Sequence, residues 1–152
     1  MIETTSERVT RHTAEPVNMR IQQEIAEKVQ YYALKPEMIE DRLQELDNEW
    51  DIERTLEMNA SILSLAGVIL GSTVSRKWYA LSGIVSAFLL QHALQGWCPP
   101  LPVFRRLGVR TQEEIDHERY LLKAVRGDFT RICLAKDAPS REAAAIEAIT
   151  RH

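Results

Sequence analysis

The distribution of charged and apolar positions divides the chain into three parts. Residues 58–75 form an uncharged run of 18 residues and residues 78–104 form another of 27, with only Arg76 and Lys77 between them. An α-helix rises about 1.5 Å per residue, so 18 residues span about 27 Å, close to the hydrocarbon thickness of a bilayer. The pattern predicts an all-α protein in which residues 58–104 form a transmembrane hairpin, with spans at about 58–75 and 78–97.

Small residues recur in the first span at spacings of four, three, four and four, which places them on one helix face. Two of them, Gly67 and Gly71, form a GxxxG pair, which permits close approach of another helix. We predict that this face packs against a helix of the same chain or of a second copy; the alternative is an ordinary helix that contains small residues. The face, called here the small-residue seam, consists of Ala60, Ser64, Gly67, Gly71 and Ser75.

Aromatic residues stand at both ends of the second span. Trp78 and Tyr79 lie at one end and Trp97 at the other, 19 residues from Trp78. This is roughly 28 Å along a helix, the separation expected of two interfacial aromatic belts. Pro99 and Pro100 then end the helix. The competing interpretation is a long hairpin buried inside a soluble helical bundle.

The arms on either side of the hairpin differ in charge. Residues 1–57 hold 7 Lys/Arg against 14 Asp/Glu, whereas residues 105–152 hold 10 against 8. More basic residues flank the outer ends of the spans than the turn, so the positive-inside rule predicts two cytoplasmic arms and an external turn. The N-terminus has no basic segment followed by an apolar one, so no cleavable signal peptide is predicted.

Periodic apolar positions predict amphipathic helices in the acidic arm. Asn18 is expected to cap the first of them. A second apolar stripe, of helical spacing, either packs within the chain or forms a docking surface for a cytoplasmic partner or a second copy. That stripe consists of Ile39, Leu43, Leu46 and Trp50.

Capping signals predict the helices of the C-terminal arm, residues 105–152. Thr111 and Glu114 have the spacing of a capping box and are expected to open one helix. Gly127 is expected to close that helix, and Ser140 to cap the last one.

Cys98 is the one candidate for chemistry. Nearby Arg105 and Arg106 would lower the thiol pKa if the proline turn folded back, making a redox or persulfide-accepting thiol. The alternative, which the sequence favours, is a small apolar side chain packed at a helix end. We find no other catalytic constellation and no cofactor motif, and no basic aromatic stripe suggests nucleic acid. No metal-ligand spacing connects the four histidines, His12, His92, His117 and His152.

Residues 50–110 resemble the YgaP-like inner-membrane domain, a two-helix bacterial membrane domain that is sometimes fused behind a rhodanese domain. The resemblance rests on Met58-Asn59-Ala60, the Gly-rich run from Ala66 to Gly71, the exit Gly96-Trp97-Cys98-Pro99, and Leu107-Gly108. It implies a bacterial inner membrane and a homodimer. Because no rhodanese active-site loop is recognised in the chain, sulfurtransferase activity is not carried over.

Two functions follow as expectations if the hairpin crosses a membrane; if it is buried instead, the expected function is that of a soluble helical-bundle interaction protein. The first is a dimerising membrane anchor or accessory subunit without catalysis of its own, whose acidic helices contact a cytoplasmic partner. The second is a membrane thiol or persulfide carrier that uses Cys98 to serve a separate sulfurtransferase.

Overall fold

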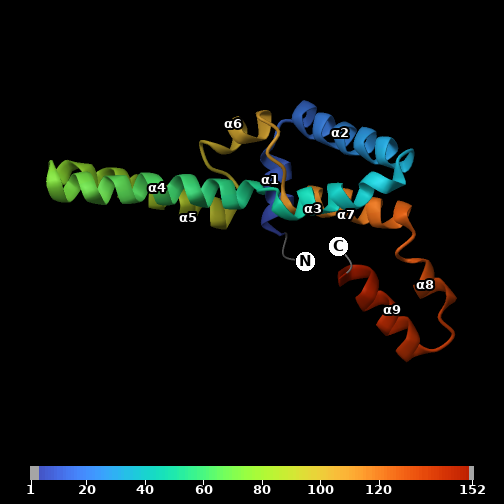
Figure 1. Ribbon diagram of the computed structural model, residues 1–152. Coiled ribbons are helices and arrows are strands. Elements are labelled where there is room, and N and C mark those ends of the chain that lie inside the picture. Colours follow the sequence, from blue (N-terminus) through green and yellow to red (C-terminus); the bar gives the residue numbers. More distant parts are fainter. Residues whose placement is uncertain (1–3, 151–152) are drawn as a thin grey trace. The chain divides into compact units, whose positions relative to one another are not determined.

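The computed structural model describes residues 4–150, and every regular element in that range is a helix. The all-α class is thus confirmed. The chain forms two compact units, unit 1 (Met1–Ile21 and Trp50–Glu113) and unit 2 (Gln22–Glu49 and Glu114–His152). Both the N-terminal and the C-terminal arm contribute to each unit (Figure 1).

Unit 1 is built around two helices that lie side by side and are joined by a short turn (Figure 1). The turn is the 3-10 helix η2, and α1 packs against the second of the two long helices. Unit 1 contains α1 (Thr5–His12), the start of α2 (Glu15–Ala33), α4 (Ile52–Thr73), η2 (Arg76–Trp78), α5 (Tyr79–Gln95), α6 (Leu101–Arg106) and the first residues of α7 (Gln112–Arg126).

The boundaries of α4 and α5 differ from the predicted spans because local caps set them. The Asp51 carboxylate accepts a hydrogen bond from the Arg54 amide at 2.7 Å, so α4 begins at Ile52, well before the uncharged run. At the other end, Gly96 adopts a left-handed φ of 73° and its amide donates to the His92 carbonyl at 2.7 Å. Among the described residues, one helical stretch, within Pro36–Thr73, is long and apolar enough to cross a membrane. Helix α5 has 17 residues.

A buried arginine holds the base of unit 1 together. Arg105 is fully buried and donates to the Thr13 hydroxyl at 3.1 Å, the Val109 carbonyl at 3.1 Å and the Asn18 side-chain carbonyl at 3.0 Å. The predicted role of Asn18 as a helix cap is wrong, because α2 begins at Glu15 and Asn18 lies inside it. The apolar core beside this network contains Val9, Ile52, Leu56, Cys98 and Leu101.

Unit 2 buries most of the predicted apolar stripe within the chain. Its elements are the rest of α2, η1 (Pro36–Met38), α3 (Ile39–Asn48), most of α7, α8 (Thr130–Leu134) and α9 (Ala138–Thr150). The α3 residues Ile39, Leu43 and Leu46 form one core with Ile115 and Leu122 of α7.

Trp50 does not belong to this core, although the predicted stripe included it. It lies beyond the end of α3 in unit 1, is 42% exposed, and has the Arg54 guanidinium 4.3 Å from its ring centre. The stripe is therefore occupied by the chain itself at three of its four positions.

Ion pairs join α3 to α7 around the core of unit 2. Arg42 lies 2.8 Å from the fully buried Glu118, and Arg119 lies 3.0 Å from Asp47. Burial lowers the pKa of Arg42, but its hydrogen bonds with Glu118 and Glu45 outweigh this and hold it above the ordinary value. These hydrogen bonds therefore favour the charged form of Arg42.

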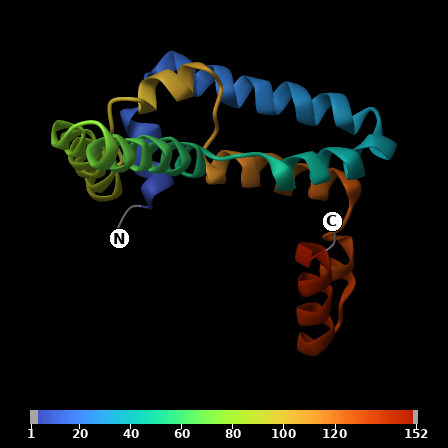
Figure 2. The same cartoon turned by 60° about the vertical axis from the view of Figure 1, so that its left-hand side comes forward.

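The C-terminal helices begin and end close to the predicted signals. Helix α7 starts directly after Thr111 and ends before Gly127, which has a φ of 87°. Ser140 does not cap α9, because the Asp137 carboxylate fills that role and accepts from the Ser140 amide at 2.8 Å. Helices α8 and α9 lie side by side (Figure 2). At the far end of α9, the buried Lys123 ammonium donates to the Ile149 carbonyl at 2.7 Å.

Candidate functional site

The most distinctive surface of the protein is the apolar exterior of α4 and α5. Only 17% of the most apolar window of α4 is buried. Soluble monomers rarely expose a continuous apolar patch of more than a few hundred Å². The hairpin therefore presents a surface suited to an apolar environment. Its side chains that are about half exposed or more include Ile62, Leu65, Val68, Ile69, Ile84, Leu90 and Leu94.

The structure places the centre of the small-residue seam against α5. A Cβ added at Gly67 would lie 2.5 Å from the Ser82 hydroxyl and 3.0 Å from the Ser82 backbone nitrogen. At Gly71 it would lie 2.8 Å from the Tyr79 ring. The Ser82 hydroxyl also donates to the Ser64 carbonyl at 2.8 Å. These three seam positions thus bring the two helices together within one chain.

The two ends of the seam behave differently. Ala60 is half-buried and lines a cavity between the helices, described below. Ser75 is exposed and lies beyond the end of α4, where its hydroxyl accepts from the Lys77 amide at 3.5 Å. The close contact between α4 and α5 therefore involves the middle of the seam, because Ala60 borders a cavity and Ser75 lies beyond the end of α4.

The predicted interfacial aromatics lie at opposite ends of α5. Trp78 and Tyr79 are both nearly half exposed, and the Tyr79 hydroxyl lies 2.9 Å from that of Ser72. Trp97 follows α5 at its other end and packs against the core of unit 1. Tyr79 thus fastens the turn end of the hairpin, while Trp97 connects the other end to the base.

Helix α1 packs over the last turn of α5. Arg8 donates to the Ala93 carbonyl at 3.3 Å, and a Cβ added at Gly96 would lie 2.4 Å from the Arg8 Cβ. His92 is 5% exposed at this crossing, and neither of its ring nitrogens has a hydrogen-bond partner among the described residues. In the sequence, His92 is only one of four histidines without metal-ligand spacing. The sequence held no signal for Arg8, because this contact joins residues far apart in the chain.

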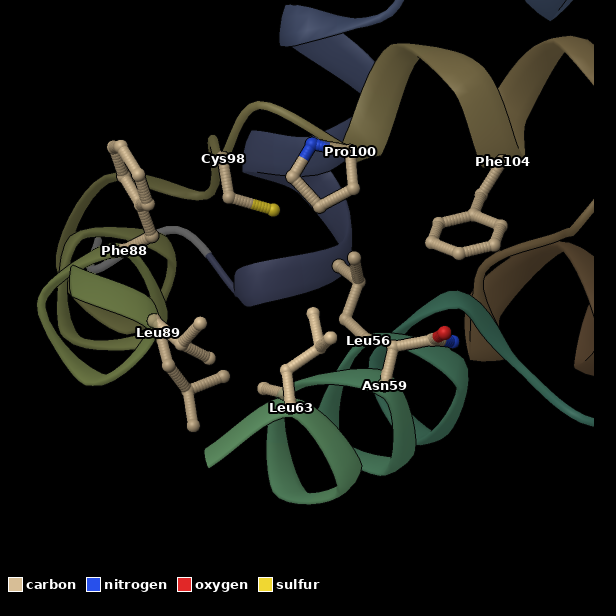
Figure 3. Close-up of a pocket in the computed structure, with 10 residues that line it drawn as sticks. Leu56, Asn59, Leu63, Phe88, Leu89, Cys98, Pro100 and Phe104 are labelled. Atoms are coloured by element: carbon tan, nitrogen blue, oxygen red, sulfur yellow. The ribbon is translucent and has the colours of Figure 1, made fainter. Parts of the chain in front are cut away.

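An apolar cavity of about 210 Å³ lies where α4 and α5 meet the segment that leads into α6 (Figure 3). Figure 3 shows the Cys98 thiol directed into it, with Phe88 on one side and Phe104 on the other. No charged side chain lines it. Its lining is Leu56, Asn59, Ala60, Leu63, Val85, Phe88, Leu89, Cys98, Pro100 and Phe104.

The surroundings of Cys98 oppose thiolate formation. Burial raises the pKa of its thiol, and a hydrogen bond with the Leu101 backbone offsets this only in part. Arg105, a cation expected to lower the pKa of this thiol, donates hydrogen bonds to Thr13, Asn18 and Val109. An activated thiol needs a nearby cation or exposure to solvent, and Cys98 is 4% exposed. In residues 4–150, no group of three or more potential ligand side chains is placed to hold a metal ion.

We expect the two cysteines to differ strongly in reactivity. Cys133 is exposed, so iodoacetamide should label it readily at neutral pH. Cys98 should label slowly, with a midpoint above the free-thiol pKa of about 8.5, since its pKa is raised and the thiolate is the reactive form. Cys133→Ala isolates Cys98, and Cys98→Ala serves as the matched control. Rapid labelling of Cys98 with a midpoint below about 8 would restore the carrier hypothesis.

No protein-family model, curated protein or solved structure matches the chain. The YgaP-like resemblance therefore stays a prediction that rests on the residues quoted for it.

Proposed function

We propose that the protein is an integral membrane protein whose α4–α5 hairpin crosses the bilayer twice and anchors the helical arms on one side. The observation behind the proposal is that the longest apolar helix leaves most of its apolar window exposed. In the competing interpretation, a soluble bundle with a buried hairpin, those side chains would be covered by the chain.

The dimensions of the two helices suit this role. Helix α4 has 22 residues, about 33 Å, and α5 has 17, about 26 Å, at the lower end of the range for a span. Serine and threonine hydroxyls in α4 are satisfied internally, as where Ser72 and Thr73 donate to carbonyls one turn back. Arg76 and Lys77 are exposed in the turn and would reach the headgroup region.

The role that best suits such an anchor is that of an accessory subunit without catalysis. We place it in a bacterial inner membrane as a homodimer with both termini cytoplasmic, in line with its YgaP-like motifs and flanking charges. Because the apolar stripe of α3 is covered, a cytoplasmic partner would meet the charged face of this helix instead. That face exposes Asp41 and Glu45 and suits a basic surface.

Membrane fractionation tests the proposal directly. The full chain should sediment with membranes, resist extraction by alkaline carbonate, and require detergent for solubility. Alkaline carbonate releases proteins that are bound only to the membrane surface, whereas a protein with an embedded segment stays in the membrane. A monodisperse protein recovered without detergent would rule the anchor out.

Topology is tested on the same membranes with a membrane-impermeant maleimide. In a Cys98→Ala, Cys133→Ala background, Lys77→Cys should label from outside intact cells. Lys136→Cys, also exposed, should label only after lysis. The reverse result would invert the predicted orientation.

A further inference from the structure

The cavity beside Cys98 has the chemistry of a lipid-binding groove. We propose that it holds one acyl chain of a membrane phospholipid. The inference rests on the proposed membrane function and adds a specific site to it.

The composition of the walls argues for a hydrocarbon occupant. The cavity of about 210 Å³ is lined by apolar side chains apart from Asn59 and Cys98. The Asn59 side chain donates one of its two amide hydrogens to the Thr55 carbonyl at 2.7 Å, which engages that hydrogen within α4. A polar ligand would therefore lose most of its hydration here for the few hydrogen-bonding groups that Asn59 retains.

The packing of α4 against α5 explains why the groove lies at the end of the hairpin that is remote from the turn. Near the turn, Gly67 and Gly71 bring α4 into close contact with α5. Toward the base the facing positions are larger, as at Leu63 and Leu89, and the helices leave a space that the segment from Cys98 to Phe104 borders (Figure 3). The space thus follows from a tight contact at one end of the hairpin and bulky side chains at the other.

The groove is continuous with the surface that would face lipid. Two of its lining residues, Leu63 and Phe88, are 47% and 40% exposed and belong to the apolar exterior of the hairpin. A phospholipid chain at the same depth would reach the groove from the side. A free fatty acid fits less well, because no cation lines the cavity to bind its carboxylate.

Native mass spectrometry of the full chain, purified from membranes in mild detergent, tests the site. The wild type should retain the mass of one phospholipid per chain after a delipidating wash. Ala60→Phe places a ring in the groove and should reduce the lipid-bound fraction at least tenfold. Val85→Phe fills the groove from the opposite wall and should act alike. Ala87→Phe, at an exposed α5 position outside the lining, is the matched control and should retain lipid as the wild type does.

Each other outcome overturns the proposal. The proposal fails if the wild type carries no bound lipid, or if the bound mass is that of a fatty acid. It also fails if both filling variants retain as much lipid as the wild type. A dimer that binds no lipid and whose stability depends on Ala60 would likewise overturn it. A wild type without bound lipid refutes the proposal even where a filling variant fails to fold, and a wild type with bound lipid leaves the site to be decided by whichever of the two filling variants folds. A protein that resists carbonate extraction but retains no phospholipid refutes this inference and leaves the membrane anchor standing.

Discussion

Replacing Arg105 with leucine should lower the free energy of unfolding by about 3 kcal/mol or more. Arg105 is fully buried and donates to Thr13, Asn18 and Val109. Leucine removes these three bonds; loss of a donor costs about 1–3 kcal/mol for a buried acceptor such as the Thr13 hydroxyl, and less for the part-buried Asn18 and Val109 acceptors. Since these bonds join α6 to Thr13, which precedes α2, and to Asn18 within α2, we expect the base of unit 1 to open first.

The neighbouring Arg106 provides the control, because its side chain is exposed. Arg106→Leu removes the same charge and should change the free energy of unfolding by no more than about 0.5 kcal/mol. Chemical denaturation in detergent followed by circular dichroism measures both variants, and hydrogen exchange of α1 reports on the base. Equal stability of the two variants would mean that the Arg105 network contributes nothing.

Replacing Gly67 with leucine should separate α4 from α5 and destabilise the hairpin by about 3 kcal/mol, at the upper end of ordinary overpacking costs. A Cβ at this position would lie 3.0 Å from the Ser82 backbone nitrogen and 3.1 Å from the Trp78 carbonyl oxygen. Because these neighbours are backbone atoms, no side-chain rotation relieves the contact. The hydrogen bond from Ser82 to the Ser64 carbonyl would be lost as well.

Gly83 is the matched control for Gly67, since it lies on α5 and a Cβ there meets nothing within 4 Å. Gly83→Leu should be neutral or slightly stabilising, because glycine is a poor helix former. Thermal unfolding in detergent distinguishes the two, and oligomer mass from light scattering shows whether either change affects a dimer. A harmless Gly67→Leu, or a harmful Gly83→Leu with altered oligomer mass, would move the important contact to a surface between chains.

The sequence predicted helices and helix ends well where the residues that determine them are neighbours in the chain. The uncharged runs predicted two apolar spans, and among the described residues one helical stretch, within Pro36–Thr73, is long and apolar enough for a span. Gly127 ends α7 as its position after the last apolar turn suggested. Two caps were misassigned, to Asn18 and Ser140, although Glu15 begins α2 and Asp137 caps α9. Several capping residues stand close together at both places, and propensity alone does not choose among neighbours of similar preference.

By itself, the sequence determined which faces must avoid water and where helices form, because both depend on spacing within a few turns. Only the tertiary structure decided what each face meets. The hydrophobic effect has no direction, so the stripe from Ile39 to Leu46 carried no sign that α7 would cover it. A GxxxG pair permits close approach without naming the partner, which here is α5. Likewise, Cys98 is buried in a core with Val9 and Ile52, which are remote from it in the chain, and no local pattern encodes these contacts.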